Sequence, residues 1–456
     1  MKGSASARAA GARRGQAPTR TIAVSFALLI LAGTALLLLP CSTRQGISVP
    51  DALFTATSAA CVTGLVAVDT YTAFTGFGQA VVLCLIQIGG LGLVTLTSFF
   101  GMTLRRRMGF HSLQLASESI GAPGAVEARR LLGTVIRVAF ACEGMGALAL
   151  CAVFVPEYGA EGVWISVFLA VSSFCNAGFD ILGRIAPYTS LTAYTGNWYV
   201  QGILMLLIFS GGLGFLVWQE LAALRRTKRL SLHTRVVLVF TLLLMLGGAL
   251  GFAVLEWSNP GTIGGMPVGD KLVASLFQSV SARTAGFNTV DLAATNQLTR
   301  LLLCMLMFIG AAPGGTGGGI KVTTFSVLAM TVLCVAFGRE DAVIFGRRIP
   351  KKTVYRAMAI TILSLAAVLV ASVTIFFNTS AVVTEMDCLF ESVSAFATVG
   401  VTIGVTASMA PAARMITMIT MFAGRVGPVS LAISLAARDS SKAVWEVLPE
   451  GRIMVG

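Results

Sequence analysis

Four short glycine-centred segments hold the residues of this sequence that are best suited to bind an ion. In each segment two uncharged residues precede one glycine, and the glycines recur at intervals of about 110 residues. The candidate ion-binding residues are Val62, Thr63 and Gly64; Asn176, Ala177 and Gly178; Thr284, Ala285 and Gly286; and Thr398, Val399 and Gly400. Glycine allows positive φ, which lets a backbone turn its carbonyl oxygen inward. A ring of carbonyls from four such segments can replace the hydration shell of a potassium ion.

Each glycine is preceded by an apolar stretch that is too short to span a membrane and too apolar for a solvated loop. These stretches begin at Leu53-Phe54, Val167-Phe168, Leu276-Phe277 and Leu389-Phe390. Non-helical backbone at membrane depth is tolerated only where it is buried in protein or lines a water-filled cavity. We therefore predict four half-helices that point their C-termini, where the helix dipole favours cations, at a common pore.

The composition requires a lipid environment around these segments. Hydrophobic residues make up 56% of the chain and charged residues only 12%, whereas soluble domains carry about 25% charged residues. Apolar runs of spanning length are found at Thr21–Pro40, Gly78–Gly101, Leu131–Val155, Trp198–Trp218, Val236–Leu255, Leu301–Phe337, Ala357–Phe377 and Ala412–Ala437. About 20 apolar residues cross a bilayer, so the sequence predicts eight spans.

Together these patterns predict an all-α membrane protein. Four helix–pore-loop–helix repeats, with eight transmembrane helices and four re-entrant pore helices, would surround a pseudo-fourfold central pore. The predicted pore modules are 21–101, 131–219, 236–337 and 353–437, between an N-terminal tail (1–20) and a C-terminal tail (438–456).

The charge distribution predicts the orientation. Most of the 33 Lys and Arg residues lie in the tails and in the loops near 102–137, 220–236 and 338–357, which share one side of the membrane. The positive-inside rule makes this side, and both termini, cytoplasmic. Acidic residues lean to the opposite side, where they would concentrate cations. The net charge of +13 is spread over short loops and does not predict a nucleic-acid surface.

The long sixth run is interrupted by a glycine-rich stretch, Gly310–Lys321. Glycine costs about 1 kcal/mol and proline about 3 kcal/mol in a helix interior, so this stretch predicts an unwound loop inside the membrane. Residues Gly314, Gly315, Thr316, Gly317, Gly318 and Gly319 are the candidate gate. A passive helix kink is the alternative. A phosphate-binding loop is excluded because Ile320 separates the lysine from the last glycine.

Arg425 lies in an apolar run near mid-membrane, where a charge is usually functional. It could repel cations from the pore or donate hydrogen bonds to the glycine-rich loop, and either role would restrain conduction. A structural arginine that ties two repeats together is the alternative. For Arg283, beside the third segment, we predict a pairing with a pore-helix carboxylate such as Glu391.

These motifs resemble the Trk/Ktr/HKT superfamily of potassium transporters and, within it, the eight-helix KtrB-type membrane subunits. The resemblance extends from about Thr21 to Ala437. It implies that Gly314–Gly319 and Arg425 form an intramembrane gate. It further implies a bacterial inner-membrane homodimer in which each protomer has its own pore. A cytoplasmic RCK-type subunit that binds ATP or ADP would regulate it, because the tail after Arg438 is too short for a nucleotide-binding domain. Members of this type include sodium-dependent ones, and the sequence leaves sodium dependence open.

Two other classes of protein fit the sequence less well. A secondary ion-coupled transporter of another small solute would have inverted repeats. Here all four repeats enter from the same side. The main intramembrane carboxylate is Glu143, for which Arg137 or a helix neighbour is the predicted partner. A membrane enzyme would need a catalytic cluster, whereas the chain has only two histidines, His111 and His233.

Each predicted filter segment has one glycine. We therefore expect the protein to prefer potassium but to exclude sodium less strictly than a filter with two glycines per segment does.

Overall fold

The computed structural model describes residues 21–92, 125–184, 186–379 and 383–427. Its helices are Thr21–Leu37, α2 (Val49–Cys61), α3 (Thr70–Ala73), α4 (Gly76–Leu91), α7 (Ala125–Tyr158), α8 (Ala160–Phe174), η1 (Thr192–Tyr194), α9 (Trp198–Gly212), α10 (Phe215–Thr227), α11 (Leu232–Glu256), α12 (Val268–Ser281), η2 (Leu292–Ala294), α13 (Gln297–Phe308), α14 (Val322–Ala336), α15 (Lys351–Phe377), α16 (Glu385–Ala397), α17 (Val405–Ser408) and α18 (Pro411–Val426). A hairpin of β1 (Val343–Ile344) and β2 (Arg347–Arg348) completes the described elements.

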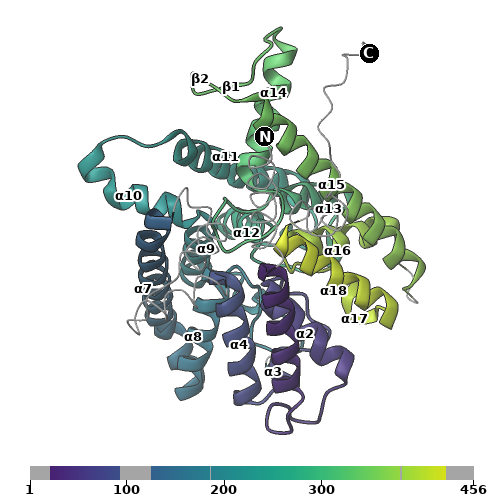
Figure 1. Cartoon of the computed structure of the whole chain (residues 1–456). Helices are drawn as coiled ribbons and strands as arrows, with labels where there is room; N and C mark the ends of the chain where they lie inside the picture. The colour runs from purple at the N-terminus through teal and green to yellow at the C-terminus, as the bar shows by residue number, and fades with distance from the viewer. Residues whose placement is uncertain (1–20, 93–124, 185, 380–382, 428–456) are drawn as a thin grey trace, which may run out of the picture.

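The helices repeat one unit four times, which confirms the predicted all-helical fold of pore-loop modules. Each unit has a first helix, a half-helix and a third helix. The half-helices are α2, α8, α12 and α16, and the third helices are α4, α9, α13 and α18. Figure 1 shows α12 and α16 near the middle of the bundle, with the longer helices around them. A half-helix of 13 to 15 residues is about 20 Å long, so it reaches only the centre of the molecule.

The spanning helices are more broken than the apolar runs predict. Among the described residues, three single helices are long and apolar enough to cross a membrane: Gly133–Tyr158, Leu232–Glu256 and Lys351–Phe377. The predicted span Trp198–Trp218 is not one helix, because α9 and α10 meet at an angle of 97°. The run Leu301–Phe337 is divided into α13 and α14. The tails 1–20 and 438–456, and the predicted span residues 93–101 and 428–437, lie outside the described residues.

Glycine explains where three of the third helices end. Gly92 and Gly214 both have φ +84°, and Gly427 has φ +94°. L-residues rarely adopt such angles, so each helix ends where glycine allows the chain to turn. In the third unit, the glycine-rich loop follows the end of α13 in the same way. The hydropathy runs continue past these glycines, which is why hydropathy alone predicted longer spans.

Each half-helix anchors one phenylalanine in the core. Phe54, Phe168, Phe277 and Phe390 are all fully buried. The apolar core is formed in two halves, one mainly from the first two units and the other from the last two. Large apolar side chains on the outer faces of α11 and α15 remain exposed, as expected for surfaces that contact lipid.

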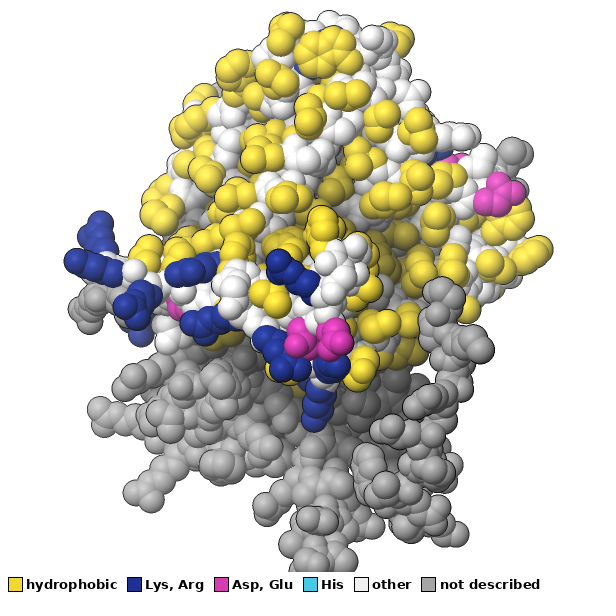
Figure 2. All heavy atoms as spheres, turned by 90° about the horizontal axis from the view of Figure 1, so that it is seen from above, with side chains coloured by type: hydrophobic (Ala, Val, Ile, Leu, Met, Phe, Trp, Pro, Cys, Tyr) yellow, Lys and Arg dark blue, Asp and Glu magenta, His cyan; other side chains and the backbone are white. Residues whose placement is uncertain are grey.

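Basic side chains mark one end of the molecule. The β1–β2 hairpin projects there beside α14 (Figure 1), and Arg348 of the hairpin pairs with Asp341 at 2.9 Å. Figure 2, seen from above, shows Lys and Arg side chains gathered in a band across the middle of the view, next to a largely hydrophobic face. We call the end with the hairpin the basic end. The half-helices begin at the opposite end, which we call the half-helix end.

Candidate ion-binding site and gate

The four predicted filter segments share one unusual backbone conformation. Each half-helix is followed by a non-glycine residue with positive φ and, two residues later, by the glycine. The φ angles are +58° at Val62, +58° at Asn176, +76° at Thr284 and +51° at Thr398, and +92° at Gly64, +68° at Gly178, +87° at Gly286 and +89° at Gly400. Positive φ is a genuine strain for β-branched residues such as Val62 and Thr398. Four copies of the same strained turn point to a shared function.

The four segments close into a ring through their glycines. Each glycine packs against the carbonyl group of the residue before the next glycine. A Cβ atom would lie 2.5 Å from the Ala177 oxygen if added to Gly64, 2.7 Å from the Ala285 oxygen if added to Gly178, 2.5 Å from the Val399 oxygen if added to Gly286, and 2.0 Å from the Thr63 oxygen if added to Gly400. The last contact returns to the first segment. No side chain fits at any of these positions, so the ring requires glycine.

Hydrogen bonds from the half-helices hold the glycines in place. The amides of Gly64 and Gly400 donate to the hydroxyl oxygens of Ser58 and Ser394, both at 3.1 Å. In the third segment Val280 takes the corresponding position, and the Gly286 amide instead approaches the Ser281 carbonyl at 3.4 Å. The third segment is therefore held less tightly than the first and the fourth.

A cavity on the half-helix side of the ring reaches all four glycines. It measures about 60 Å³, and Asp69 and Asp180 also line it. Asp69 accepts hydrogen bonds from the amides of Thr72 at 2.8 Å and Tyr188 at 3.1 Å. Burial is the largest cause that raises the pKa of Asp180, the Leu182 amide opposes it by a hydrogen bond, and the nearby Asp69 adds to the rise, so that the pKa is about 6. Two carboxylates thus lie where a cation would approach the ring.

The glycine-rich loop lies directly against the other side of the ring. A Cβ atom on Gly317 would lie 2.0 Å from the Thr284 hydroxyl oxygen, and one on Gly318 would lie 2.2 Å from that of Thr398. The loop runs as irregular backbone between α13 and α14 and is closed by a bridge of Ile309 with Ile320. This arrangement confirms the predicted break in the long apolar run.

Three cationic side chains, Arg425, Lys321 and Arg283, donate hydrogen bonds to carbonyl groups of the loop. Arg425 donates to the carbonyls of Thr316 and Gly89, and at 3.3 Å to that of Gly90. It therefore joins the loop to the end of α4. Of the two roles predicted for Arg425, the structure contains the hydrogen bond to the loop.

Lys321 holds the loop at its end, through a 2.7 Å hydrogen bond to the Gly317 carbonyl. No role for Lys321 was predicted, although a lysine two residues after Gly319, between two apolar stretches, is a usable signal. A cavity of about 370 Å³ opens on the basic side of the loop. The side chains of Lys321, Arg356 and Arg425 line it together with the loop glycines.

The pairing predicted between Arg283 and Glu391 is wrong. Arg283 donates to the Thr241 carbonyl at 3.1 Å and to the Gly310 carbonyl at 3.0 Å, so it holds the start of the glycine-rich loop. Glu391 instead accepts hydrogen bonds from the hydroxyl groups of Thr402 and, at 2.9 Å, Thr406. The carboxylate faces the irregular chain and the short helix α17 that follow the fourth segment.

Glu143 also has a different partner from the arginine considered for it. The side-chain amide of Gln87 donates to both carboxylate oxygens, at 2.9 and 3.1 Å. Arg137 turns to the carbonyl of Gly133 at 3.0 Å. The hydrogen bonds between Gln87 and Glu143 join α4 to α7. The thiol of Cys175 lies 3.9 Å from the Glu143 carboxylate.

Comparisons with known proteins agree with this geometry. Residues 5–447 match the TrkH family, described as cation transport protein. The chain is 38% identical over 440 residues to the Ktr system potassium uptake protein B of Bacillus subtilis (strain 168), with 96% of this chain and 97% of that relative covered. It is 36% identical to the potassium/sodium uptake protein NtpJ of Enterococcus hirae, with coverage of 97% and 98%. Among solved structures, the potassium transporter TrkH from Vibrio parahaemolyticus matches with a TM-score of 0.70 and 19% identity, over 92% of this chain and 85% of that one.

Proposed function

Since the chain belongs to the TrkH family of cation transport proteins, we propose that it takes up potassium ions through the ring formed by the four glycine segments. The observation that carries this proposal is the closure of the ring, in which every glycine packs on the carbonyl group that precedes the next glycine. The choice of potassium is supported by the names of two relatives that match nearly the whole chain, both of which include potassium.

In this proposal the ion ligands are backbone carbonyl groups of the twelve segment residues. The carbonyls of Thr63, Ala177, Ala285 and Val399 lie at the contacts between segments and are the central ligands. The C-termini of the four half-helices add the negative ends of their dipoles. One glycine per segment supplies fewer stacked sites than the filter of a potassium channel, so sodium competes. The name of the Enterococcus hirae relative includes both ions.

Residues Gly314–Gly319 and Arg425 form the proposed gate. The loop lies against the ring at Thr284 and Thr398, and Arg425 connects it to α4. While these contacts persist, the loop blocks the path from the ring to the basic cavity. Release of Arg425 from the Thr316 carbonyl would free the loop to move aside.

The proposed orientation places the half-helix end outside the cell and the basic end in the cytoplasm of a bacterium, in its inner membrane. Both termini would then be cytoplasmic. The acidic cavity at Asp69 and Asp180 would face the incoming ions, and the basic residues would follow the positive-inside rule. The four modules would have the boundaries that the sequence predicts.

We also propose a homodimer and a cytoplasmic regulatory subunit of the RCK type that binds ATP or ADP. The support is that the relatives at 37% and 38% identity are named as components of a Ktr system. The basic end offers the charged surface for such a subunit (Figure 2).

Rubidium flux into proteoliposomes that contain the purified protein, with sodium as competitor, tests the proposal. We expect rubidium and potassium to be carried in preference to sodium, and this preference to fall in Gly286→Ser. A correctly folded protein that carries no monovalent cation, with or without a cytoplasmic partner, would contradict it.

A further inference from the structure

The third helix of each unit contacts the half-helix of the next unit through one polar pair near the half-helix end. The four pairs follow the ring in order. They are Trp164 Nε1 to Gln79 Oε1 at 2.9 Å, Trp198 Nε1 to Asp270 Oδ1 at 2.5 Å, Arg300 Nη1 to Asp387 Oδ1 at 2.6 Å, and Arg414 Nη1 to Asp51 Oδ1 at 2.5 Å. Two junctions therefore use neutral donors, and the two on either side of the fourth unit use ion pairs.

The two ion pairs have the same construction. Arg300 and Arg414 are each the fourth residue of a third helix, α13 and α18. The same position holds Gln79 in α4 and Gln201 in α9. The internal repeat thus shows that glutamine can occupy this position, and that arginine was placed at two of the four junctions.

The aspartates also occupy matching positions. Asp51 and Asp387 lie in the first turns of α2 and α16, where a negative charge is favourable. Each carboxylate uses its second oxygen within its own helix start. Asp51 accepts from the Ser48 hydroxyl at 2.6 Å, and Asp387 accepts from the Thr384 amide at 3.0 Å. Each carboxylate is therefore also held by its own helix start, independently of the arginine.

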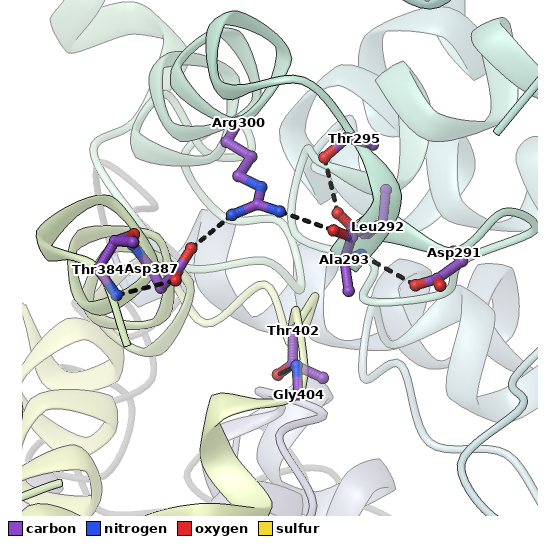
Figure 3. A network of polar contacts seen from close by, with 9 residues as sticks. All are labelled: Asp291, Leu292, Ala293, Thr295, Arg300, Thr384, Asp387, Thr402 and Gly404. Atoms are coloured by element: carbon purple, nitrogen blue, oxygen red, sulfur yellow. Dashed lines mark hydrogen bonds and ion pairs between the residues drawn. The ribbon is translucent and has the colours of Figure 1, made fainter. Parts of the chain in front are cut away.

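Each arginine holds a third element, the chain that leaves the filter segment of its own unit. Arg300 donates to the Ala293 carbonyl at 2.7 Å, and Arg414 donates to the Ala407 carbonyl at 3.2 Å. Figure 3 shows Arg300 between Ala293 on one side and Asp387 with Thr384 on the other. One guanidinium thus connects the exit of one filter segment to the start of the half-helix that carries the next.

We propose that Arg300 and Arg414 are positioning residues that set the ion selectivity of the filter by fixing the fourth unit between its two neighbours. This inference rests on the proposed function. Both pairs are largely shielded from solvent, with side-chain exposures of 17% and 15% for Arg300 and Asp387 and of 22% and 21% for Arg414 and Asp51. The half-helix α16 is a rigid element whose far end carries Thr398–Gly400. A shift at Asp387 therefore moves the carbonyl groups of the ring.

The test is a double-mutant cycle on potassium selectivity. Arg300→Gln, Asp387→Asn and the double variant are reconstituted, and the sodium concentration that halves rubidium flux is measured. Arg414→Gln with Asp51→Asn forms the second cycle. The matched control is Arg184→Gln with Glu161→Asn, a pair at 2.8 Å whose side chains are 54% and 38% exposed. The midpoint of thermal unfolding in detergent is recorded for every variant.

We expect each single variant to lower the preference for rubidium over sodium about fivefold, because a shift of the half-helix changes the distances from the ring carbonyls to the ion. Because both partners act through one contact, the double variant should lose little more than either single variant. Wild-type selectivity in Arg300→Gln and Arg414→Gln, or a change equal to that in the control pair, would overturn the inference and leave the proposed function intact. Additive losses within each cycle would also overturn it. A wild-type protein without preference for rubidium or potassium would overturn both.

Discussion

The carbonyl oxygen of Thr63 lies directly against Gly400, where a Cβ atom would come within 2.0 Å of it. Residues at opposite ends of the sequence thus close the ring of four segments. The contact leaves no room for a side chain, and Gly400 also has φ +89°. Both constraints act on the same residue.

Gly400→Ala should therefore disturb the ring. We expect the preference for potassium over sodium to fall at least tenfold, because the facing carbonyl must move and its distance to the ion changes. Competition of sodium with rubidium flux measures the effect. Gly247→Ala is the control, since a Cβ atom there meets nothing within 4 Å. Equal selectivity in the two variants would show that Gly400 does not shape the ion site.

Arg425→Ala should raise the flux. The substitution removes the hydrogen bonds to the carbonyls of Thr316, Gly89 and Gly90, so the loop loses its connection to α4. We expect a several-fold increase in rubidium flux without a regulatory subunit. Arg356→Ala is the matched control, because Arg356 lines the same cavity and no hydrogen bond links it to the loop in the described structure. A lower flux in Arg425→Ala would instead indicate that the arginine supports an open pore.

The flux should depend on the pH at the half-helix end. Burial raises the pKa of Asp180 from 3.8 to about 6, so its carboxyl group is ionised at pH 7.5 and mostly neutral at pH 5. Protonation removes a negative charge from the cavity beside the ring, and flux should fall as the external pH drops through about 6. Asp180→Asn cannot ionise, so its flux should be as low at pH 7.5 as the wild-type flux is at pH 5. A variant with the pH dependence of the wild type would assign the titration to another group.

Arg283→Met should destabilise the protein. The side chain is 7% exposed, and its loss leaves the carbonyls of Thr241 and Gly310 without their donor. We expect the free energy of unfolding to fall by about 3 kcal/mol, because hydrogen bonds to a buried charge are strong and their loss leaves polar groups unpaired. Thermal unfolding in detergent measures this. Arg137→Met, on the exposed face of α7, should change little.

The labelling of Cys41 should reveal the orientation. Cys41 is exposed and lies in the connection that leads to the start of α2. A membrane-impermeant thiol reagent should label it in intact cells, and the signal should disappear in Cys41→Ser. Labelling only after permeabilisation would reverse the proposed topology.

The sequence predicted the four glycine turns and the glycine-rich break better than it predicted the ends of the helices. Repetition revealed the four segments, because glycine at Gly64, Gly178, Gly286 and Gly400 is required by backbone geometry and has no substitute. The glycine-rich break between α13 and α14 followed from helix propensity in the same way. The ends of α4, α9 and α18 were missed, since one glycine hardly changes the mean hydropathy of a long apolar run.

Contacts between units could not be predicted from the sequence. Arg283 and Glu391 both lie near glycine segments, yet they bind different parts of the chain, and no spacing in the sequence contains that information. The same holds for the bond of Arg425 to the end of α4, which connects residues 335 and 336 positions apart. The arginine pairs at Asp51 and Asp387 become visible only when the units are placed in order around the axis.

The most direct test of the central claim is the anomalous scattering of rubidium in crystals of the protein grown in rubidium chloride. The account predicts a peak on the axis of the ring, within coordination distance of the carbonyl oxygens of Thr63, Ala177, Ala285 and Val399, and a weaker peak when sodium is added. Ordered glycine segments with no rubidium between them, in a protein that still carries rubidium across a membrane, would contradict the account.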